Sequence, residues 1–243
     1  MRAFCCVLLL ANGLWAQSAP DPPERAVSWQ QLFPNIVDDQ KLIWTFPIRI
    51  FENHNWVPVL VVSGVTAGLI AADPSTGGYF RRTTAFHSFN SIFSGSNTAL
   101  ATAIAPLSFY ALALVRKDTH AQKTALLAGE AVADAEILAI AMKAATRRVR
   151  PQDLPAHSKF GDTWFEGKAT SGSFPSAHAM AAFSIAAVFA RRYPRHRWVP
   201  FAAYGLAGLV SFSRITLSAH FPADVFMGAA LGYSISRFSV LRQ

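Results

Sequence analysis

The stretch Ser213–Asp224, with the sequence SRITLSAHFPAD, places an arginine, a histidine and a carboxylate between two uncharged apolar segments. Proline is tolerated in the first turn of a helix, so Pro222 predicts a helix start. His220 would lie at the entrance of that helix and Asp224 in its first turn. A carboxylate at this spacing can accept the Nδ1–H of His220 and leave Nε2 free as a nucleophile.

Arg214 adds a permanent cation, whose planar fork of donors suits a phosphate group. The simpler interpretation of the same stretch is a helix start with a surface ion pair, which is a common structural feature. The choice between the two interpretations depends on what the rest of the chain brings to this point.

The hydrophobic content of the chain is high for a soluble enzyme and low for a transporter. Of the 243 residues, 52% are hydrophobic and 15% are charged, the mean hydropathy is +0.26 and the formal net charge is +8. A basic balance indicates anionic substrates, an anionic membrane surface or the cytoplasmic loops of a membrane protein. The chain has no nucleic-acid-binding motif and no single basic face, so we expect no nucleic-acid partner.

The N-terminus has the pattern of a secretory signal over Met1–Ala16, with Arg2 before a short apolar core and small residues after it. An uncleaved anchor is the alternative. Both cysteines, Cys5 and Cys6, lie in this segment, so no disulfide is expected in the rest of the chain. We divide the chain into residues 1–16, a linker with an amphipathic segment over residues 17–55, and a helical domain over residues 56–243.

Six apolar segments predict an all-α fold, a bundle of about six helices, because no strand-like alternation competes with them. A turn-rich break is expected at Asp73–Gly78. The third segment carries Glu130, Asp134 and Glu136, carboxylates that face either a bundle interior or water. The six segments are Trp56–Ala72, Asn97–Val115, Thr124–Met142, Ser176–Ala190, Trp198–Phe212 and Val225 to about Val240.

Two further clusters lie at the ends of these segments. Lys143 and Arg150 follow the third, where a cationic helix C-terminus is also favoured by the helix dipole alone. Ser176 and His178 open the fourth, where Ser176 is a natural N-cap and the free N–H groups of the first turn form an anion site. If the helices alternate in direction, both clusters share one end of the bundle with the Ser213–Asp224 stretch. That inventory of donors suits a transferring phosphoryl group.

Together the three clusters resemble the signature of the type-2 phosphatidic acid phosphatase and vanadium haloperoxidase superfamily. That signature reads Lys-x6-Arg-Pro, Pro-Ser-Gly-His and Ser-Arg-x5-His-x3-Asp. Here it becomes Lys143…Arg150-Pro151, Pro175-Ser176-Ala177-His178 and Ser213-Arg214…His220…Asp224. The resemblance covers residues 124–243, the motif core. Ala177 replaces the usual glycine, which would be harmful only if a positive φ were needed there.

The resemblance implies a phosphoric ester hydrolase of this family, which needs no cofactor and no metal. His220 would attack phosphorus and form a phosphohistidine, and Asp224 would orient it. His178 would protonate the leaving oxygen and then activate water. The phosphoryl oxygens would be held by Lys143, Arg150, Ser176, the Ala177 N–H and Arg214, whereas Arg147 and Arg148 would only flank the motif.

Three other interpretations remain at this point. A zinc site built from His178, His220 and Asp224 would have to form beside three cations, which repel a metal ion. A vanadate-dependent haloperoxidase would use the same pocket, although such enzymes are generally longer chains. If the chain were a non-catalytic membrane bundle, the presence of all three motifs would be an accident.

The expected substrate is a lipid phosphate or a small phosphate ester, with membrane lipids as the surrounding partner and no expectation for the oligomeric state. The basic segments Arg116–Lys123 and Arg191–Arg197 would share one side of a six-span bundle. By the positive-inside rule this predicts a bacterial inner-membrane protein whose active site faces the periplasm. A first span that starts in the cytoplasm conflicts with a cleaved signal peptide. A soluble periplasmic non-specific acid phosphatase is therefore the alternative.

Overall fold

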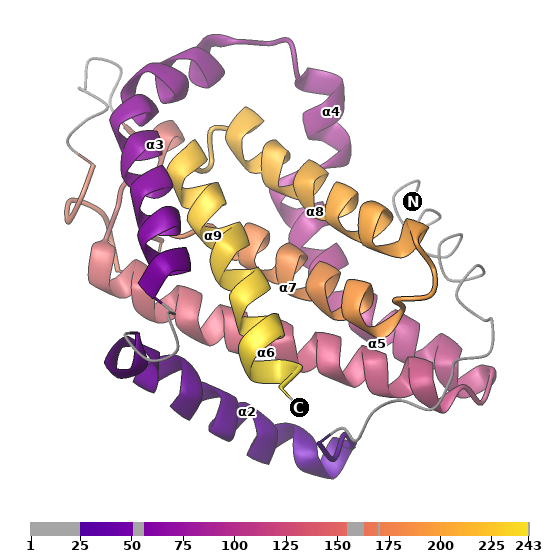
Figure 1. The fold of residues 1–243 in the computed structure, drawn as a ribbon. Helices are drawn as coiled ribbons and strands as arrows, with labels where there is room; N and C mark the ends of the chain where they lie inside the picture. Colours follow the sequence, from indigo (N-terminus) through magenta and orange to yellow (C-terminus); the bar gives the residue numbers. More distant parts are fainter. Residues whose placement is uncertain (1–24, 51–55, 155–162, 170, 243) are drawn as a thin grey trace.

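The computed structural model describes residues 25–50, 56–154, 163–169 and 171–242. The signal segment over residues 1–16 lies outside them. Throughout the described residues the secondary structure is helical, as expected, and Figure 1 shows the helices gathered into one bundle. The main helices are α2 (Trp29–Thr45), α3 (Trp56–Arg82), α4 (His87–Ile92), α5 (Gly95–Val115), α6 (Thr119–Thr146), α7 (Ala177–Arg192), α8 (Trp198–Thr216) and α9 (Pro222–Ile235). Two short 3₁₀ helices, η1 (Phe46–Arg49) and η3 (Pro151–Asp153), and a short π-helix, η4 (Ser236–Val240), complete them.

Helix α7 is the centre of the bundle, in contact with α5, α6, α8 and α9. Its buried positions are mostly alanines, which allow close approach of neighbouring helices. Helix α9 lies close against it, and a Cβ added to Gly228 would lie 2.5 Å from the carbonyl oxygen of Ser176. One turn further on, Gly232 lies against the backbone of Met180. These two glycines let α7 and α9 pack almost backbone to backbone, which fixes the starts of both helices beside each other.

The predicted break at Asp73–Gly78 is wrong, because α3 continues to Arg82. Pro74 removes one helical N–H donor, a cost that ordinarily ends or kinks a helix. Here Gly77 and Gly78 are buried, and the buried Asp73 is bound by groups from two other parts of the chain. Tertiary contacts therefore override the local preference for a turn.

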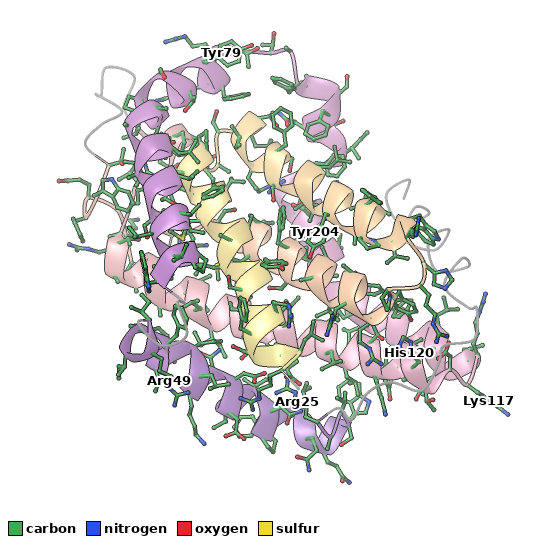
Figure 2. The ribbon with its side chains drawn as sticks, in the orientation of Figure 1. Arg25, Arg49, Tyr79, Lys117, His120 and Tyr204 are labelled. Carbon is green, nitrogen blue, oxygen red and sulfur yellow. The ribbon has the colours of Figure 1, made fainter. Side chains whose placement is uncertain are left out.

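Helix α2 was expected only as an amphipathic segment, and it packs on α6 through polar groups. Gln40 Nε2 donates to Asp134 Oδ1 at 2.8 Å. Arg25, labelled in Figure 2 where α2 faces the bundle, makes two 2.9 Å bonds to Asp39 and also pairs with Glu130. Two of the three carboxylates in α6, Glu130 and Asp134, therefore face the interior, and the third, Glu136, is exposed.

Two helices of the described chain, α3 and α5, are long and apolar enough to cross a membrane. Few of their side chains are buried. In α3, Leu60 and Val61 are each 60% exposed, and in α5, Leu107 is 58% exposed. Their apolar surfaces face outward, which is the arrangement expected of helices surrounded by lipid.

Candidate active site

The ends of four helices meet at one end of the bundle. These are the C-termini of α6 and α8 and the N-termini of α7 and α9 (Figure 1). A backbone bond of 2.9 Å from Ser176 N to Asp224 O joins the starts of α7 and α9. Another of 2.9 Å, from Gln152 N to Ser218 O, joins the loop after α6 to the turn after α8. The three sequence clusters are thus brought together as predicted.

Helix α6 ends where Arg147 adopts a left-handed conformation and donates its N–H to Lys143 O at 2.9 Å. The chain then turns back toward the bundle, and Arg150 Nε donates to Ser171 O at 3.1 Å. Lys143 lies in the last turn of α6 and is partly buried. Both cations are close enough to His220 for their charges to act on its titration.

Helix α7 begins with an anion-binding geometry. The buried Ser176 is its N-cap, and the Ser176 Oγ accepts the N–H of Ala179 at 3.5 Å. The N–H groups of Ala177 and His178 precede the first intrahelical bond, from Met180 N to Ser176 O, so they have no helical partner. Ala177 is absent from the positive-φ residues of the described chain. Alanine therefore keeps the backbone donor at this position without strain.

His178 and Arg214 both contact backbone carbonyls where α4 ends and α5 begins. His178 Nε2 donates to Gly95 O at 3.2 Å, and Arg214 donates to Phe93 O through Nη2. Arg214 is 1% exposed. It also donates to the hydroxyl of its neighbour Ser213, and these bonds fix the position of its guanidinium. The carbonyls of Phe93 and Gly95 therefore face the donors that the sequence assigns to the phosphoryl group.

His220 lies in the turn before α9 and is 2% exposed. Its Nδ1–H donates to the carbonyl oxygen of Ser173 at 2.7 Å. The nearest oxygen of Asp224 is 3.9 Å from Nδ1, beyond hydrogen-bond distance. The expected direct bond from His220 to Asp224 is therefore not formed, because the Ser173 carbonyl occupies the donor.

Both oxygens of the Asp224 carboxylate accept hydrogen bonds from groups other than His220. Arg148 Nη1 donates to Oδ1 at 2.5 Å, and Oδ2 accepts from Ser173 Oγ at 2.5 Å and from Phe221 N at 2.9 Å. Asp224 is 0% exposed. A zinc ion held by His178, His220 and Asp224 would have to break these bonds, which argues against the zinc interpretation.

Three residues of this network were not found from the sequence. Arg148 was expected only to flank the motif, and it is 1% exposed and bound to Asp224. Asp73 of α3 was placed in a turn, and it pairs with Arg148 at 2.7 Å. Ser173 links Asp224 to His220. One signal for Asp73 was available, since it is the only charged residue between Trp56 and Phe80 in the sequence.

The site is electropositive, with His220 and Asp224 buried and Lys143, Arg150 and His178 partly buried. Burial lowers the pKa of His178 to about 4, and the charges of Arg214, His220 and Lys143 act in the same direction. Burial also lowers the pKa of His220, against the opposing effect of Asp224. Both imidazoles are thus neutral at pH 7, so His220 has an unprotonated Nε2 and is able to act as a nucleophile.

A group of three carboxylates lies outside this site. The ligand atoms of Asp39, Glu130 and Asp134 are within 4.8 Å of one another, close enough to hold a metal ion. However, Arg25 already pairs with Asp39 and with Glu130. We therefore interpret this group as the polar contact that fixes α2 on α6.

Comparison with known proteins adds a family to this geometry. Residues 122–243 match the family model described as the PAP2 superfamily, which is half of the chain. The lipid A 1-phosphatase of Rhizobium etli is 36% identical over 96 residues, which cover 40% of this chain and 40% of that protein. The undecaprenyl-diphosphatase of Sulfolobus acidocaldarius is 32% identical over 106 residues, 43% of this chain and 50% of that protein. The chain thus spans half or less of the length of these curated relatives.

One solved structure also aligns with this chain. It is the crystal structure of a transmembrane PAP2 type phosphatidylglycerolphosphate phosphatase from Bacillus subtilis. The alignment covers 85% of this chain and 91% of that chain, with 21% sequence identity and a TM-score of 0.44.

Proposed function

We propose that this chain, which belongs to the PAP2 superfamily, is a phosphatase that hydrolyses a lipid phosphate or diphosphate through a phosphohistidine intermediate. One observation carries the proposal. Two neutral histidines, the buried His220 and the partly buried His178, lie at adjoining helix starts, within reach of the charges of Lys143, Arg150 and Arg214. Such an arrangement offers a nucleophile, a proton donor and fixed donors for a transferring phosphoryl group.

In the first step, Nε2 of His220 attacks phosphorus, and the bond from phosphorus to the leaving oxygen breaks. His178 binds a proton when the anionic substrate arrives and passes that proton to the leaving oxygen. The Ala177 N–H, the Ser176 hydroxyl and the three cations hold the remaining phosphoryl oxygens.

In the second step, His178 takes a proton from water, and that water attacks the phosphohistidine. The bond between phosphorus and nitrogen breaks and inorganic phosphate leaves, so His220 returns to its neutral form, and the proton that His178 took from water replaces the one it gave to the leaving oxygen. His178 carries out both proton transfers of this cycle and the cationic side chains bind the phosphoryl oxygens, so we expect the reaction to proceed in excess EDTA.

The preference for a lipid substrate is supported by an aromatic cluster next to Arg214. We define it as Phe80, Phe86, Phe89, Phe93 and Phe212, whose neighbouring rings lie with centroids 4.8–6.3 Å apart. Phe93 belongs both to this cluster and, through its carbonyl, to the contact with Arg214. An acyl or prenyl chain attached to a bound phosphate would have an apolar surface to follow. The relatives named for lipid A and undecaprenyl diphosphate are consistent with this choice.

We further propose that α3 and α5 lie in the bacterial inner membrane and that the site faces the periplasm. The exposed apolar surfaces of the two helices support the membrane location. The orientation rests on the basic connections at the opposite end of the bundle, where Lys117, labelled in Figure 2, joins α5 to α6. Release of the protein by a carbonate wash would contradict the membrane location and favour the soluble phosphatase.

The proposal is tested with purified protein in excess EDTA. We expect phosphate release from lipid phosphates and an acid-labile phosphoenzyme, both abolished in His220→Ala. A phosphoenzyme that still forms in His220→Ala would contradict the assignment of the nucleophile. Halide oxidation that depends on vanadate, without phosphate release, would support the haloperoxidase interpretation instead.

A further inference from the structure

Asp73 reaches the candidate site from outside the region that matches the family model. It lies in α3, is 0% exposed, and accepts two hydrogen bonds. Arg148 Nη2 donates to its Oδ2 at 2.7 Å, and Ala223 N donates to its Oδ1 at 3.3 Å. Burying a carboxylate is costly unless it is paired and hydrogen-bonded, so this side chain is held in one position by its partners.

Arg148 is fixed from every side. Its Nη1 donates to Asp224, its Nη2 to Asp73, and its Nε to Thr163 Oγ1 at 3.1 Å. The guanidinium carbon lies 4.4 Å from the ring centroid of Trp164 and 4.3 Å from that of Phe221. A planar guanidinium that bridges two carboxylates while it stacks on two rings is specific to arginine, and it leaves the carboxylate of Asp224 little freedom to move.

Ser173 joins this network to His220 through hydrogen bonds. Its hydroxyl donates to Asp224 Oδ2 at 2.5 Å, and its carbonyl oxygen accepts the Nδ1–H of His220 at 2.7 Å. The N–H of Ser173 donates to Arg148 O at 2.7 Å, so both ends of the residue are held by the same network. A carbonyl can only accept, which fixes the proton of neutral His220 on Nδ1 and leaves Nε2 unprotonated.

We propose that Asp73, Arg148 and Ser173 are positioning residues for His220, and that they act in series through Asp224. In this arrangement the carboxylate of Asp224 orients Ser173, and the Ser173 carbonyl orients the imidazole. The proposal rests on the proposed role of His220 as nucleophile for its kinetic consequence. The tautomer of His220 follows from the geometry alone and is measurable without any substrate.

The first test is kinetic and uses the full-length chain. Ser173→Ala keeps the carbonyl but loses the bond to Asp224, and Asp73→Asn removes the charge that balances Arg148. We expect each to slow phosphoenzyme formation about 10–100-fold, by analogy with the loss of a hydrogen-bond partner behind a metal-binding histidine, with KM nearly unchanged. Ser173→Thr, which keeps the hydroxyl, should restore most of the rate.

Asp134→Asn is the matched control, because Asp134 is also a carboxylate with 0% exposure that accepts a hydrogen bond, but it lies under α2. It should keep the wild-type phosphorylation rate. If Asp73→Asn fails to fold, the Ser173→Ala and Ser173→Thr pair carries the test. If Asp134→Asn slowed phosphorylation as much as Asp73→Asn does, the slowing would reflect general destabilisation of the fold, and the proposal would be wrong.

The second test reads the tautomer by ¹⁵N NMR of histidine-labelled protein, with the His220 signals assigned from His220→Ala. We expect neutral His220 protonated on Nδ1 in the wild type and a mixture of tautomers in Ser173→Ala, where the lost bond to Asp224 no longer holds the carbonyl of residue 173 against Nδ1. An unchanged tautomer together with an unchanged phosphorylation rate would refute the proposal. If the wild type forms no phosphoenzyme but the tautomer of His220 still changes in Ser173→Ala, the positioning network is supported and the proposed function is rejected.

Discussion

The Nε2 atom of His178 lies 3.2 Å from the carbonyl oxygen of Gly95, at the first residue of α5. Since a carbonyl only accepts, neutral His178 carries its proton on Nε2. His220 has the opposite tautomer, with its proton on Nδ1 toward Ser173. The two neutral imidazoles thus hold opposite tautomers, because His178 donates from Nε2 to a backbone carbonyl and His220 leaves the lone pair of its Nε2 free.

The depressed pKa of His178 predicts a loss of stability at acid pH. In the folded chain this pKa is about 4, against about 6.5 for an unperturbed histidine. As the pH falls from 6.5 toward 4, the unfolded state binds a proton that the folded state does not, so the free energy of unfolding decreases. Between pH 7 and pH 4.5 the contribution is about 2 kcal/mol.

The measurement is denaturant unfolding in detergent at both pH values, for the wild type and His178→Gln. The glutamine does not titrate, so its stability should decrease by about 2 kcal/mol less than that of the wild type. Equal losses in the two proteins would show that His178 titrates normally in the folded state.

The two histidines should respond differently to the leaving group. In His178→Ala the leaving oxygen loses its proton donor, and general acid catalysis typically contributes about 10²–10⁴-fold. We expect that loss with an alkyl phosphate and a smaller one in the first step with a nitrophenyl phosphate, whose leaving group needs no proton. His220→Ala should be inactive on both substrates. The same dependence on leaving-group pKa in both variants would contradict the assignment.

The local motifs of the site could be predicted from the sequence, whereas the contacts that support it could not. Lys143, Arg150, His178 and Arg214 lie at helix ends, and apolar periodicity locates helix ends well enough to bring them together. Asp73 and Arg148 are 75 residues apart, and no local pattern reports which distant side chain pairs with a buried charge. A lone carboxylate in an apolar helix indicates only that some partner is needed.

Two errors in the predicted fold have the same origin. The residues Pro74, Gly77 and Gly78 have the composition of a turn, and the helix continues through them because buried contacts hold it. The direct bond expected between His220 and Asp224 has suitable spacing, and the backbone of Ser173 takes the donor instead. In both cases local chemistry gave a reasonable expectation, and a contact distant in sequence decided the outcome.

The packing of α9 on α7 predicts opposite effects for two glycine substitutions. Gly232→Ala would push a Cβ into the backbone of Met180, and overpacking of this kind costs about 1–3 kcal/mol. Gly205 of α8 has no neighbouring atom within 4 Å of an added Cβ. Gly205→Ala should therefore stabilise the chain by about 0.5–1 kcal/mol through helix propensity.

Thermal unfolding in a single detergent compares the two variants directly. Because α7 and α9 carry His178 and His220 at their starts, Gly232→Ala should also lower the phosphatase rate, whereas Gly205→Ala should leave it unchanged. A Gly232→Ala variant as stable as the wild type would mean that the two helices are further apart than described.

The last prediction concerns α4, which was not expected from the sequence and which lies over the end of α8. Two hydrogen bonds join them, from Asn90 Nδ2 to Thr216 O at 3.1 Å and from Thr216 Oγ1 to Asn90 Oδ1 at 2.6 Å. Asn90→Ala removes both bonds and frees α4, which carries Phe89 of the aromatic cluster. We expect KM for a long-chain lipid phosphate to rise several-fold with little change in kcat, because α4 would support the apolar chain and not the reacting phosphorus. A soluble phosphate ester, which has no such chain, should show nearly the wild-type KM.

Ser91→Ala is the control, since Ser91 is exposed and its hydroxyl bonds within α4, to Ser88 O. An equal rise in KM for both substrates would instead mean that α4 acts on the phosphate site itself, through the contact of Phe93 with Arg214.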